Sequence, residues 1–255
     1  MDYAKLKAEY DVSGYLIIRR FLVGEELQTL QRNIDRYIRE IVPTLPAGDA
    51  FYENPVLPET LKQLNRMQQD TNFKDYTSHP LWKSTAEALL GEPAEAQGAE
   101  WFNKPPRTSH VTPPHQDNFY FCLTPSQVLT MWLALDNVDE ENGCLRYVPG
   151  SHLRGIRPHS RTKTLGFSQG ITDYDDQDRD QEVVVHAQPG DLLIHHGDMI
   201  HRAEANRSSI RHRRSFAMVF QGQSCSRDET AFQRYLQSAA TQHQQMGVVK
   251  NHDEE

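Results

Sequence analysis

The stretch Pro113-Pro114-His115-Gln116-Asp117-Asn118-Phe119-Tyr120-Phe121 places an imidazole and a carboxylate two residues apart. In a strand, side chains at positions i and i+2 point to the same face, so His115 and Asp117 would present a ring nitrogen and a carboxylate oxygen together. Two histidines and one carboxylate on one face of a metal are typical of non-heme Fe(II) oxygenases. Since His-x-Asp also occurs as an exposed polar pair, a third ligand from elsewhere in the chain is required.

The composition argues against nucleic-acid and membrane partners. The chain has 255 residues with 27 Lys plus Arg and 35 Asp plus Glu, giving a net charge of -8. This charge does not favour broad binding to nucleic acid or to anionic membranes. The sequence begins without an apolar signal segment, and it has no apolar run of about 18 residues that could span a bilayer. From the length and the absence of these segments we expect a single cytoplasmic domain.

Three cysteines, Cys122, Cys144 and Cys225, are widely spaced and odd in number. This pattern favours reduced thiols over a disulfide framework or a zinc site.

The first part of the chain, about residues 1–96, is expected to be a mainly helical cover. A short strand within 12–23 precedes a helix from Gly24 to Val42, in which apolar residues recur every three or four positions. Residues 43–58 contain four prolines and predict a loop. Residues 59–91 predict mostly helix that ends at Gly91.

After about residue 97, short apolar stretches alternate with turn residues. We place strands near 99–104, 115–123, 128–135, 144–149, 182–188, 191–196, 199–205 and 213–221. This spacing predicts a mainly β fold with flanking helices, whose core, about residues 97–222, is a double-sheet jelly roll. A C-terminal helix and a frayed polar tail are expected within about 223–255.

The third metal ligand should lie on a late strand that faces the first one, directly after a tight turn. His201 follows the turn residues Gly197-Asp198 and meets this condition, 84 residues beyond Asp117 (201 minus 117). His195 and His196 on the preceding strand are alternatives that the pattern leaves open.

A set of motifs in a fixed order resembles the phytanoyl-CoA dioxygenase family over about residues 10–222. The motifs are Asn103-Lys104-Pro105-Pro106, His115-Gln116-Asp117, Trp132, Glu141-Asn142-Gly143-Cys144-Leu145, Pro149-Gly150-Ser151-His152, Pro189-Gly190-Asp191, His201, Asn206 and Arg213. The resemblance implies an Fe(II)- and 2-oxoglutarate-dependent hydroxylase with a double-stranded β-helix fold. It also implies that His201, which begins the family's His-to-Asn segment, is the distal metal ligand.

On this resemblance, His115, Asp117 and His201 hold iron and leave three positions for 2-oxoglutarate and dioxygen. The far carboxylate of 2-oxoglutarate needs a buried planar cation, for which Arg213 is the first choice. The interval from His201 to Arg213 is one residue longer than usual, so Arg211 and Arg214 stay alternatives.

Two further residues follow from the same resemblance. Trp132 aligns with a tryptophan that lines the co-substrate pocket. The alternative is that Trp132 is a tryptophan packed in the core, which the sequence does not distinguish from a pocket residue. Ala203 replaces a serine that often binds the co-substrate, so Thr130 or a tyrosine could supply that hydroxyl. Related halogenases replace the carboxylate ligand with a small residue, and the presence of Asp117 therefore favours hydroxylation.

Residues 150–181 form a long insertion between the fourth and fifth expected strands. Its first half is basic and its second half is acidic: Arg154, Arg157, His159, Arg161 and Lys163, then Asp173, Asp175, Asp176, Asp178 and Asp180. One hypothesis is that the basic half meets an anionic substrate. The alternative is that the two halves pair with each other or are solvated.

The sequence therefore predicts a dioxygenase that hydroxylates an unactivated C–H bond of a small polar or anionic metabolite and releases succinate and CO2. The alternatives are a non-catalytic metal-binding jelly roll, a related oxidative cyclisation or desaturation, and a zinc hydrolase. A hydrolase would have no use for a buried arginine that faces the metal, so the location of Arg213 distinguishes it.

Overall fold

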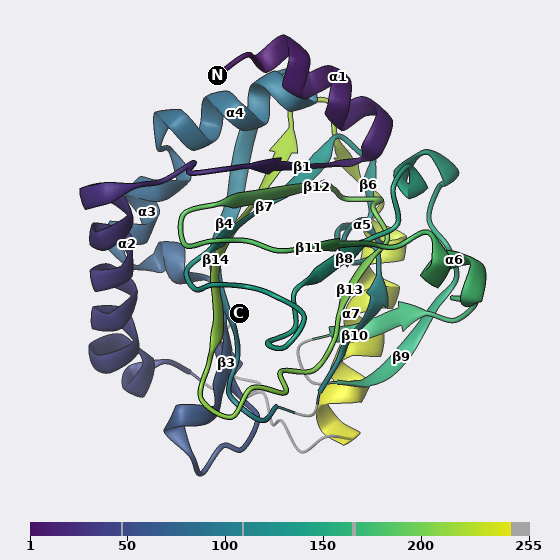
Figure 1. Ribbon diagram of the computed structural model, residues 1–255. Coiled ribbons are helices and arrows are strands. Elements are labelled where there is room, and N and C mark those ends of the chain that lie inside the picture. The colour runs from purple at the N-terminus through teal and green to yellow at the C-terminus, as the bar shows by residue number, and fades with distance from the viewer. Residues whose placement is uncertain (47, 109, 165–166, 246–255) are drawn as a thin grey trace.

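Two antiparallel sheets face each other in the computed structural model, which describes residues 1–46, 48–108, 110–164 and 167–245 (Figure 1). In spatial order, the seven-stranded major sheet consists of β1 (Tyr15–Ile18), β12 (Leu192–His196), β7 (Val128–Ala134), β14 (Arg213–Gly222), β4 (Ala94–Lys104), β3 (Leu61–Leu64) and β2 (Ala50–Tyr52). The four-stranded minor sheet consists of β11 (Val183–Val185), β8 (Leu145–Tyr147), β13 (His201–Ala203) and β5 (Thr112–His115). This pair of sheets is the predicted jelly-roll core, and the sheets do not close into a barrel.

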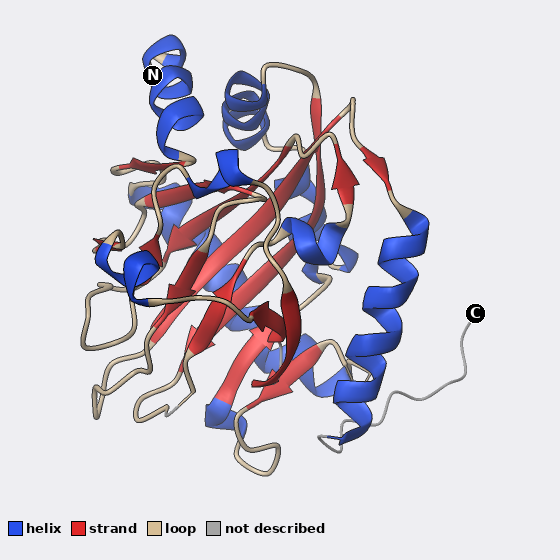
Figure 2. Ribbon diagram, turned by 90° about the vertical axis from the view of Figure 1, so that its right-hand side faces the viewer, coloured by secondary structure: helices blue, strands red, loops and turns tan. Residues whose placement is uncertain are grey.

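Helices cover the outer face of the major sheet (Figures 1 and 2). The N-terminal ones are α1 (Tyr3–Ser13), α2 (Gly24–Arg36), α3 (Thr71–Thr77) and α4 (Pro80–Leu90). α2 continues through a π turn, η1 (Tyr37–Ile41), into a 3-10 turn, η2 (Val42–Thr44). α4 ends where the chain turns left-handed at Gly91, whose N–H donates to the Glu87 carbonyl as a C-cap does. The predicted helix from Gly24 and the predicted end at Gly91 are both confirmed.

Strand alternation divides the interior of the protein into two layers. Phe216, Met131 and Leu133 point outward into the core under the helices. There the Trp82 ring packs edge-on against Phe216, with ring centroids 5.9 Å apart, and edge-on against Phe21, with centroids 5.2 Å apart. Trp132 and Ala217 point inward and pack against the minor sheet. β7 is therefore buried along its whole length, which explains its continuous apolar sequence.

Several predicted boundaries were wrong. The expected loop 43–58 and helix 59–91 contain β2 and β3, which are too short to show a strand period, together with the 3-10 turns η3 (Pro58–Thr60) and η4 (Met67–Gln69). The strand expected at 99–104 begins earlier, at Ala94. The strand expected at 115–123 is instead the end of β5, a helical turn α5 (Asn118–Phe121) and the two-residue β6 (Leu123–Thr124).

The insertion at 150–181 is folded. It contains a 3-10 turn η5 (Ser151–Arg154), the paired strands β9 (His159–Thr164) and β10 (Phe167–Ile171), and α6 (Asp176–Asp180). The predicted C-terminal helix is α7 (Glu229–Gln245), which follows the short β15 (Ser226–Arg227) paired with β6 and lies beside β9 and β10 (Figure 1). The predicted frayed tail, from residue 246 onward, falls outside the described residues, and the single-domain organisation stays a prediction.

We predict that the turn before β12 depends on Gly190. Gly190 has φ +88°, and a Cβ there would lie 2.1 Å from the Leu22 carbonyl oxygen, which is backbone and cannot move aside. Gly24 also has positive φ, +57°, but a Cβ there would meet nothing within 4 Å. Gly24→Ala should cost about 1–2 kcal/mol from left-handed strain, and Gly190→Ala about 1–3 kcal/mol more from the clash. Urea denaturation of both variants measures the difference, and equal losses would contradict the proposed role of the Leu22 contact.

Candidate metal centre

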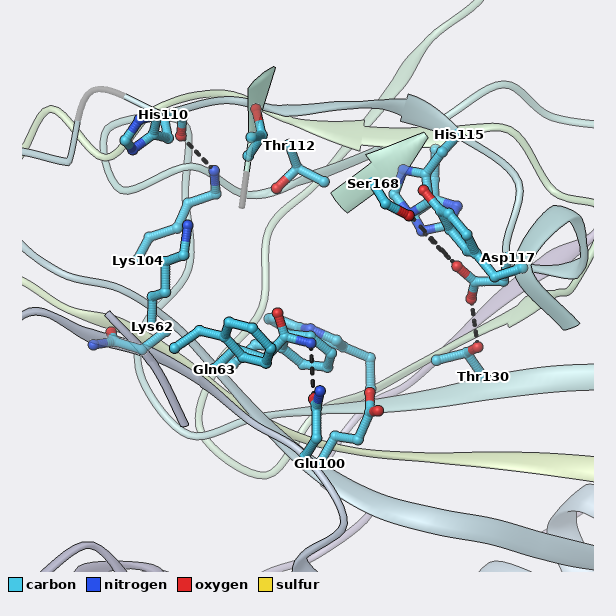
Figure 3. A pocket seen from close by; sticks show the side chains of 18 of the residues that line it. Lys62, Gln63, Glu100, Lys104, His110, Thr112, His115, Asp117, Thr130 and Ser168 are labelled. Atoms are coloured by element: carbon cyan, nitrogen blue, oxygen red, sulfur yellow. Dashed lines mark hydrogen bonds and ion pairs between the residues drawn. The ribbon is translucent and has the colours of Figure 1, made fainter. Parts of the chain in front are cut away.

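A cavity of about 320 Å³ lies between the two sheets (Figure 3). The major sheet contributes Thr130, Trp132, His195 and Arg213, and the minor sheet contributes His115, Leu145 and His201. The end away from the sheets is bounded by the β9–β10 hairpin and α7, through Thr164, Ser168, Tyr235 and Ala239. Side chains from the beginning, middle and end of the chain therefore meet in one space.

The three predicted metal ligands come together in this cavity. His115 ends β5 and His201 begins β13, and the two residues are cross-strand partners whose ring centroids are 4.1 Å apart. One ligand atom from each of His115, Asp117 and His201 lies within 4.8 Å of the others. Asp117 is not on a strand: its φ and ψ of -59° and -37° are helical, and it precedes α5. The turn, rather than strand alternation, brings its carboxylate beside His115.

Backbone carbonyls fix the orientation of both imidazoles. The Nδ1 of His115 lies 2.8 Å from the Pro113 carbonyl, and the Nδ1 of His201 lies 3.0 Å from the Met199 carbonyl. Because a carbonyl only accepts, each Nδ1 carries a hydrogen, which leaves each Nε2 as the nitrogen that can bind a metal. Burial, followed by the nearby His115 and His195, holds the pKa of His201 well below its usual value, so this ring stays neutral as a metal ligand must.

The Asp117 carboxylate is ionised although it is buried. Burial alone would raise its pKa, but His201, His115 and His195 together lower the pKa of Asp117 well below its ordinary value. Its Oδ1 lies 3.5 Å from His115 Nε2 and 3.7 Å from His201 Nε2. Two imidazoles and one carboxylate, all directed at one point, fit the donor set that Fe(II) takes in non-heme oxygenases.

Thr130 lines the cavity, and its hydroxyl donates to Asp117 Oδ2 at 2.6 Å (Figure 3). It therefore helps to hold the carboxylate, and its expected contact with a co-substrate stays a prediction. The Tyr120 hydroxyl, which also lines the cavity, donates to the Gln169 carbonyl. Ala203 is buried and adds no hydroxyl.

Of the three candidate arginines, only Arg213 lines the cavity. Its guanidinium lies 5.4 Å from the centre of the Trp132 ring, and its Nε has no hydrogen-bond partner among the described residues. Burial lowers the pKa of Arg213 to about 10, so it remains a cation at neutral pH. Arg214, on the other face of β14, pairs with Asp136, and Arg211 pairs with Asp139 and Glu141 near the surface.

The basic residues of the insertion do not line the cavity. Arg157 forms ion pairs with Asp173 and Asp178. These pairs join the basic half of the insertion to its acidic half, which is the alternative to contact with an anionic substrate. His159 stacks on Phe119 and accepts from the Gln116 N–H. The insertion reaches the cavity through the hairpin residues Thr164 and Ser168 instead.

Sequence reasoning missed several polar groups of the cavity, chiefly Lys62, Glu100, Lys104 and Tyr235. Glu100, Phe102 and Lys104 alternate within the strand expected at 99–104, so the strand period of two could have placed all three on one face. Lys62 carried no such signal because β3 was predicted to be helical. His195 was considered only as a rival metal ligand, and it contacts Asp117 Oδ2 through Nε2 at 3.1 Å.

All three cysteines are free thiols, as expected; Cys144 is buried, and Cys122 and Cys225 are partly exposed. In the part of the chain that the structure describes, no helix has the length and apolar character needed to cross a membrane.

Comparisons with known proteins agree with the geometry of this site. The model of the family described as phytanoyl-CoA dioxygenase (PhyH) matches residues 10–215. A phytanoyl-CoA dioxygenase of Arabidopsis thaliana is 33% identical over 243 residues, covering 81% of this chain and 84% of the relative. The peroxisomal phytanoyl-CoA dioxygenase of Mus musculus is 27% identical over 215 residues; the match covers 78% of this chain but only 62% of the mouse protein. The cytoplasmic location expected for this chain stays a prediction.

Solved structures share the fold at lower identity. The epimerase SnoN, in complex with Fe3+, alpha ketoglutarate and nogalamycin RO, superimposes with a TM-score of 0.71 at 23% identity, covering 88% of this chain and 85% of SnoN. The non-heme alpha ketoglutarate dependent carbocyclase SnoK from nogalamycin biosynthesis has a TM-score of 0.69 at 25% identity, with coverage of 88% and 85%. From the family match across most of its length, this chain belongs to the phytanoyl-CoA dioxygenase family.

Proposed function

We propose that this protein is an Fe(II)- and 2-oxoglutarate-dependent dioxygenase that hydroxylates a small polar metabolite. The observation that carries the proposal is that one cavity holds a His-Asp-His donor set together with a buried arginine that lacks a full set of hydrogen-bond partners among the described residues. A metal-binding module without turnover would have no need of that arginine. A zinc hydrolase would have no need of it either.

His115 Nε2, His201 Nε2 and Asp117 Oδ1 would hold the iron. When bound, iron would bring 2-oxoglutarate and dioxygen together: dioxygen is the oxidant, oxidation of 2-oxoglutarate to succinate and CO2 supplies two electrons, and one oxygen atom remains for the substrate C–H bond. The protein's own contribution is to orient both rings through backbone carbonyls, to keep the carboxylate ionised and to hold the reactants together between the sheets.

Arg213 would bind the far carboxylate of 2-oxoglutarate. Guanidinium is planar and offers paired N–H donors that match a carboxylate. Lys104 is the cross-strand partner of Arg213, and Trp132 lies against the guanidinium. Figure 3 shows Lys104 and Lys62 at the end of the cavity opposite His115 and Asp117. Burial, and then the charge of Arg213, lower the pKa of Lys104 well below its usual value, and burial lowers the pKa of Lys62. An anionic co-substrate would favour the charged form of both amines, so this end of the cavity suits a carboxylate.

The rest of the cavity favours a polar substrate. Glu100 lines it with a carboxyl that has no hydrogen bond or ion pair among the described residues, and Tyr120, Ser168 and Tyr235 border the same space. A volume of about 320 Å³ that also holds 2-oxoglutarate leaves room for a small metabolite. Because both signs of charge face the cavity, the substrate class is polar without being restricted to anions.

Oxidative cyclisation is the second candidate reaction, since the structural neighbour SnoK is named as a carbocyclase. Both reactions begin with the same oxidation at a C–H bond. Product mass distinguishes them: hydroxylation adds one oxygen atom to the substrate, whereas cyclisation or desaturation removes two hydrogens. Asp117 occupies the position that a halide would need, which argues against halogenation.

We predict that Arg213→Met weakens 2-oxoglutarate binding strongly while Arg214→Met, the adjacent residue on the outer face of β14, does not. Loss of a buried charge pair costs about 2–4 kcal/mol, roughly 30- to 1000-fold in Kd. Anaerobic titration of the Fe(II) protein with 2-oxoglutarate, followed by its charge-transfer absorption, measures the affinity. If the wild-type protein gives no such absorption, and no succinate when air is admitted, the proposed function is wrong. If the two variants bind 2-oxoglutarate equally well, Arg213 is not the residue that binds its far carboxylate, but the proposed function stands.

We also predict that Glu100→Gln stabilises the metal-free protein at alkaline pH. Burial, and then the negative charge of Asp117, raise the pKa of Glu100 to about 7, whereas in the unfolded chain it titrates near its ordinary value. Because the carboxyl ionises more easily in the unfolded chain, the folded state loses stability as the pH rises from about 4.5 to about 7. Above about pH 7 the loss of stability is at its full value.

Removing the Glu100 charge should raise the free energy of unfolding by about 1–3 kcal/mol at about pH 8, and have little effect near pH 4.5–5. Urea denaturation at the two pH values measures this. Glu95→Gln changes an exposed position on the same strand and is the matched control. It should leave the free energy of unfolding unchanged at both pH values. A pH-independent difference for Glu100→Gln would contradict the raised pKa.

A further inference from the structure

We propose that His195 is a positioning residue of the metal centre, which donates a hydrogen bond that keeps Asp117 a one-oxygen ligand and is itself oriented by Tyr147. This inference rests on the proposed iron site and concerns groups that do not bind the metal. His195 was a rival for the third ligand position, and its ring centroid lies only 4.3 Å from that of His201. Its contacts nevertheless assign it a different role.

The two oxygens of Asp117 have different surroundings. Oδ1 faces Nε2 of His115 and Nε2 of His201, at 3.5 and 3.7 Å. Oδ2 is held by two other groups, the Thr130 hydroxyl at 2.6 Å and His195 Nε2 at 3.1 Å. One oxygen is thus directed at the metal position and the other is directed into hydrogen bonds with the major sheet.

The direction of the hydrogen bonds follows from counting donors and acceptors. The ionised Asp117 carboxylate only accepts, so His195 donates through Nε2. The Nδ1 of His195 lies 3.0 Å from the Tyr147 hydroxyl, which is fully buried. If the ring donated through Nδ1 as well, the Tyr147 proton would have no acceptor among the described residues. Tyr147 therefore donates to Nδ1, and the ring donates to Asp117 through Nε2.

The fold places these donors rigidly. Thr130 and His195 are cross-strand partners on β7 and β12, in the middle of the major sheet. Tyr147 lies on β8 of the minor sheet, where it pairs with His201, and its ring stacks on Tyr15 at 4.8 Å. The chain of bonds from Tyr147 through His195 to Asp117 therefore crosses the space between the sheets twice, and its members cannot shift independently.

The consequence concerns the number of open metal positions. A carboxylate that turned to offer both oxygens would occupy a position that 2-oxoglutarate or dioxygen needs. Two donors on Oδ2 oppose that rotation, because turning would leave the buried hydroxyl of Thr130 and N–H of His195 without an acceptor. Groups that orient a metal ligand in this way typically change metal affinity by about 10- to 100-fold when removed.

The test compares variants at position 195 that retain different parts of the imidazole. In His195→Gln the amide nitrogen reaches about as far as Nε2 and can still donate to Asp117. In His195→Asn the amide reaches only about as far as Nδ1, so it can meet Tyr147 but not Asp117. His195→Leu retains neither contact. The measured quantity is the Kd for Co(II), by competition with a chelator and without 2-oxoglutarate, on variants whose thermal melts show that they are folded.

We expect His195→Gln to bind Co(II) within about threefold of the wild type, and both His195→Asn and His195→Leu to bind about 10- to 100-fold more weakly. Tyr147→Phe should weaken binding less than His195→Leu, because the ring keeps its donor but loses its orientation. His186→Leu removes an exposed histidine that does not line the cavity and should leave the Kd unchanged.

Equal Co(II) affinity of His195→Leu and the wild type would overturn the inference. So would equal losses in His195→Gln and His195→Leu, since packing alone would then account for both. Wild-type protein that binds Co(II) but no 2-oxoglutarate would contradict the proposed function and leave the positioning role supported. Should His195→Leu not fold, Thr130→Val combined with His195→Gln provides the comparison: it removes one donor from Oδ2 and should weaken Co(II) binding relative to His195→Gln alone.

Discussion

The burial of one ionised carboxylate, Asp117, is the constraint on which this structure depends. A carboxylate taken out of water is costly unless its oxygens are satisfied, and in Asp117 they face three histidines and a threonine. These partners come from both sheets, so the carboxylate can be satisfied only when the sheets are packed at their native separation. The site and the fold therefore stabilise each other, and a bound cation would further stabilise the buried carboxylate.

Strand register converts this constraint into a cavity with two distinct ends. His115 and His201 are paired across β5 and β13, which fixes one end. Arg213 and Lys104 are paired across β14 and β4, which fixes the other. On the inward face of β14, Arg213 and Val219 line the cavity, whereas the outward Phe216 and Met218 fill the core beneath the helices. A single alternating strand thus serves the cavity with one face and the core with the other.

Sequence reasoning found the parts of the site that carry a strong local signal. The candidate ligand histidines His115 and His201, Asp117 and Arg213 lie in motifs whose residue types and order are informative, and the structure places all of them in one cavity. It failed where local signal is weak: β2 and β3 are three and four residues long, and β9 is exposed and polar on a surface hairpin. The role of Thr130 could not be predicted either, because its hydrogen bond spans 13 residues and depends on the turn at Asp117.

The adjacent histidines of β12 show why pattern alone left the third ligand undecided. Strand alternation sends neighbouring side chains to opposite faces, so His195 points into the cavity and His196 points away from it. His196 accepts the Asp198 N–H through Nδ1, and burial lowers its pKa to about 4, so it serves as a neutral acceptor in the turn that leads to His201. Three histidines within seven residues thus have three tasks: one positions the carboxylate, one shapes the turn and one is directed at the metal position. Residue type cannot separate these tasks, because each needs a neutral imidazole, and only the face and the hydrogen-bond partner of each ring can.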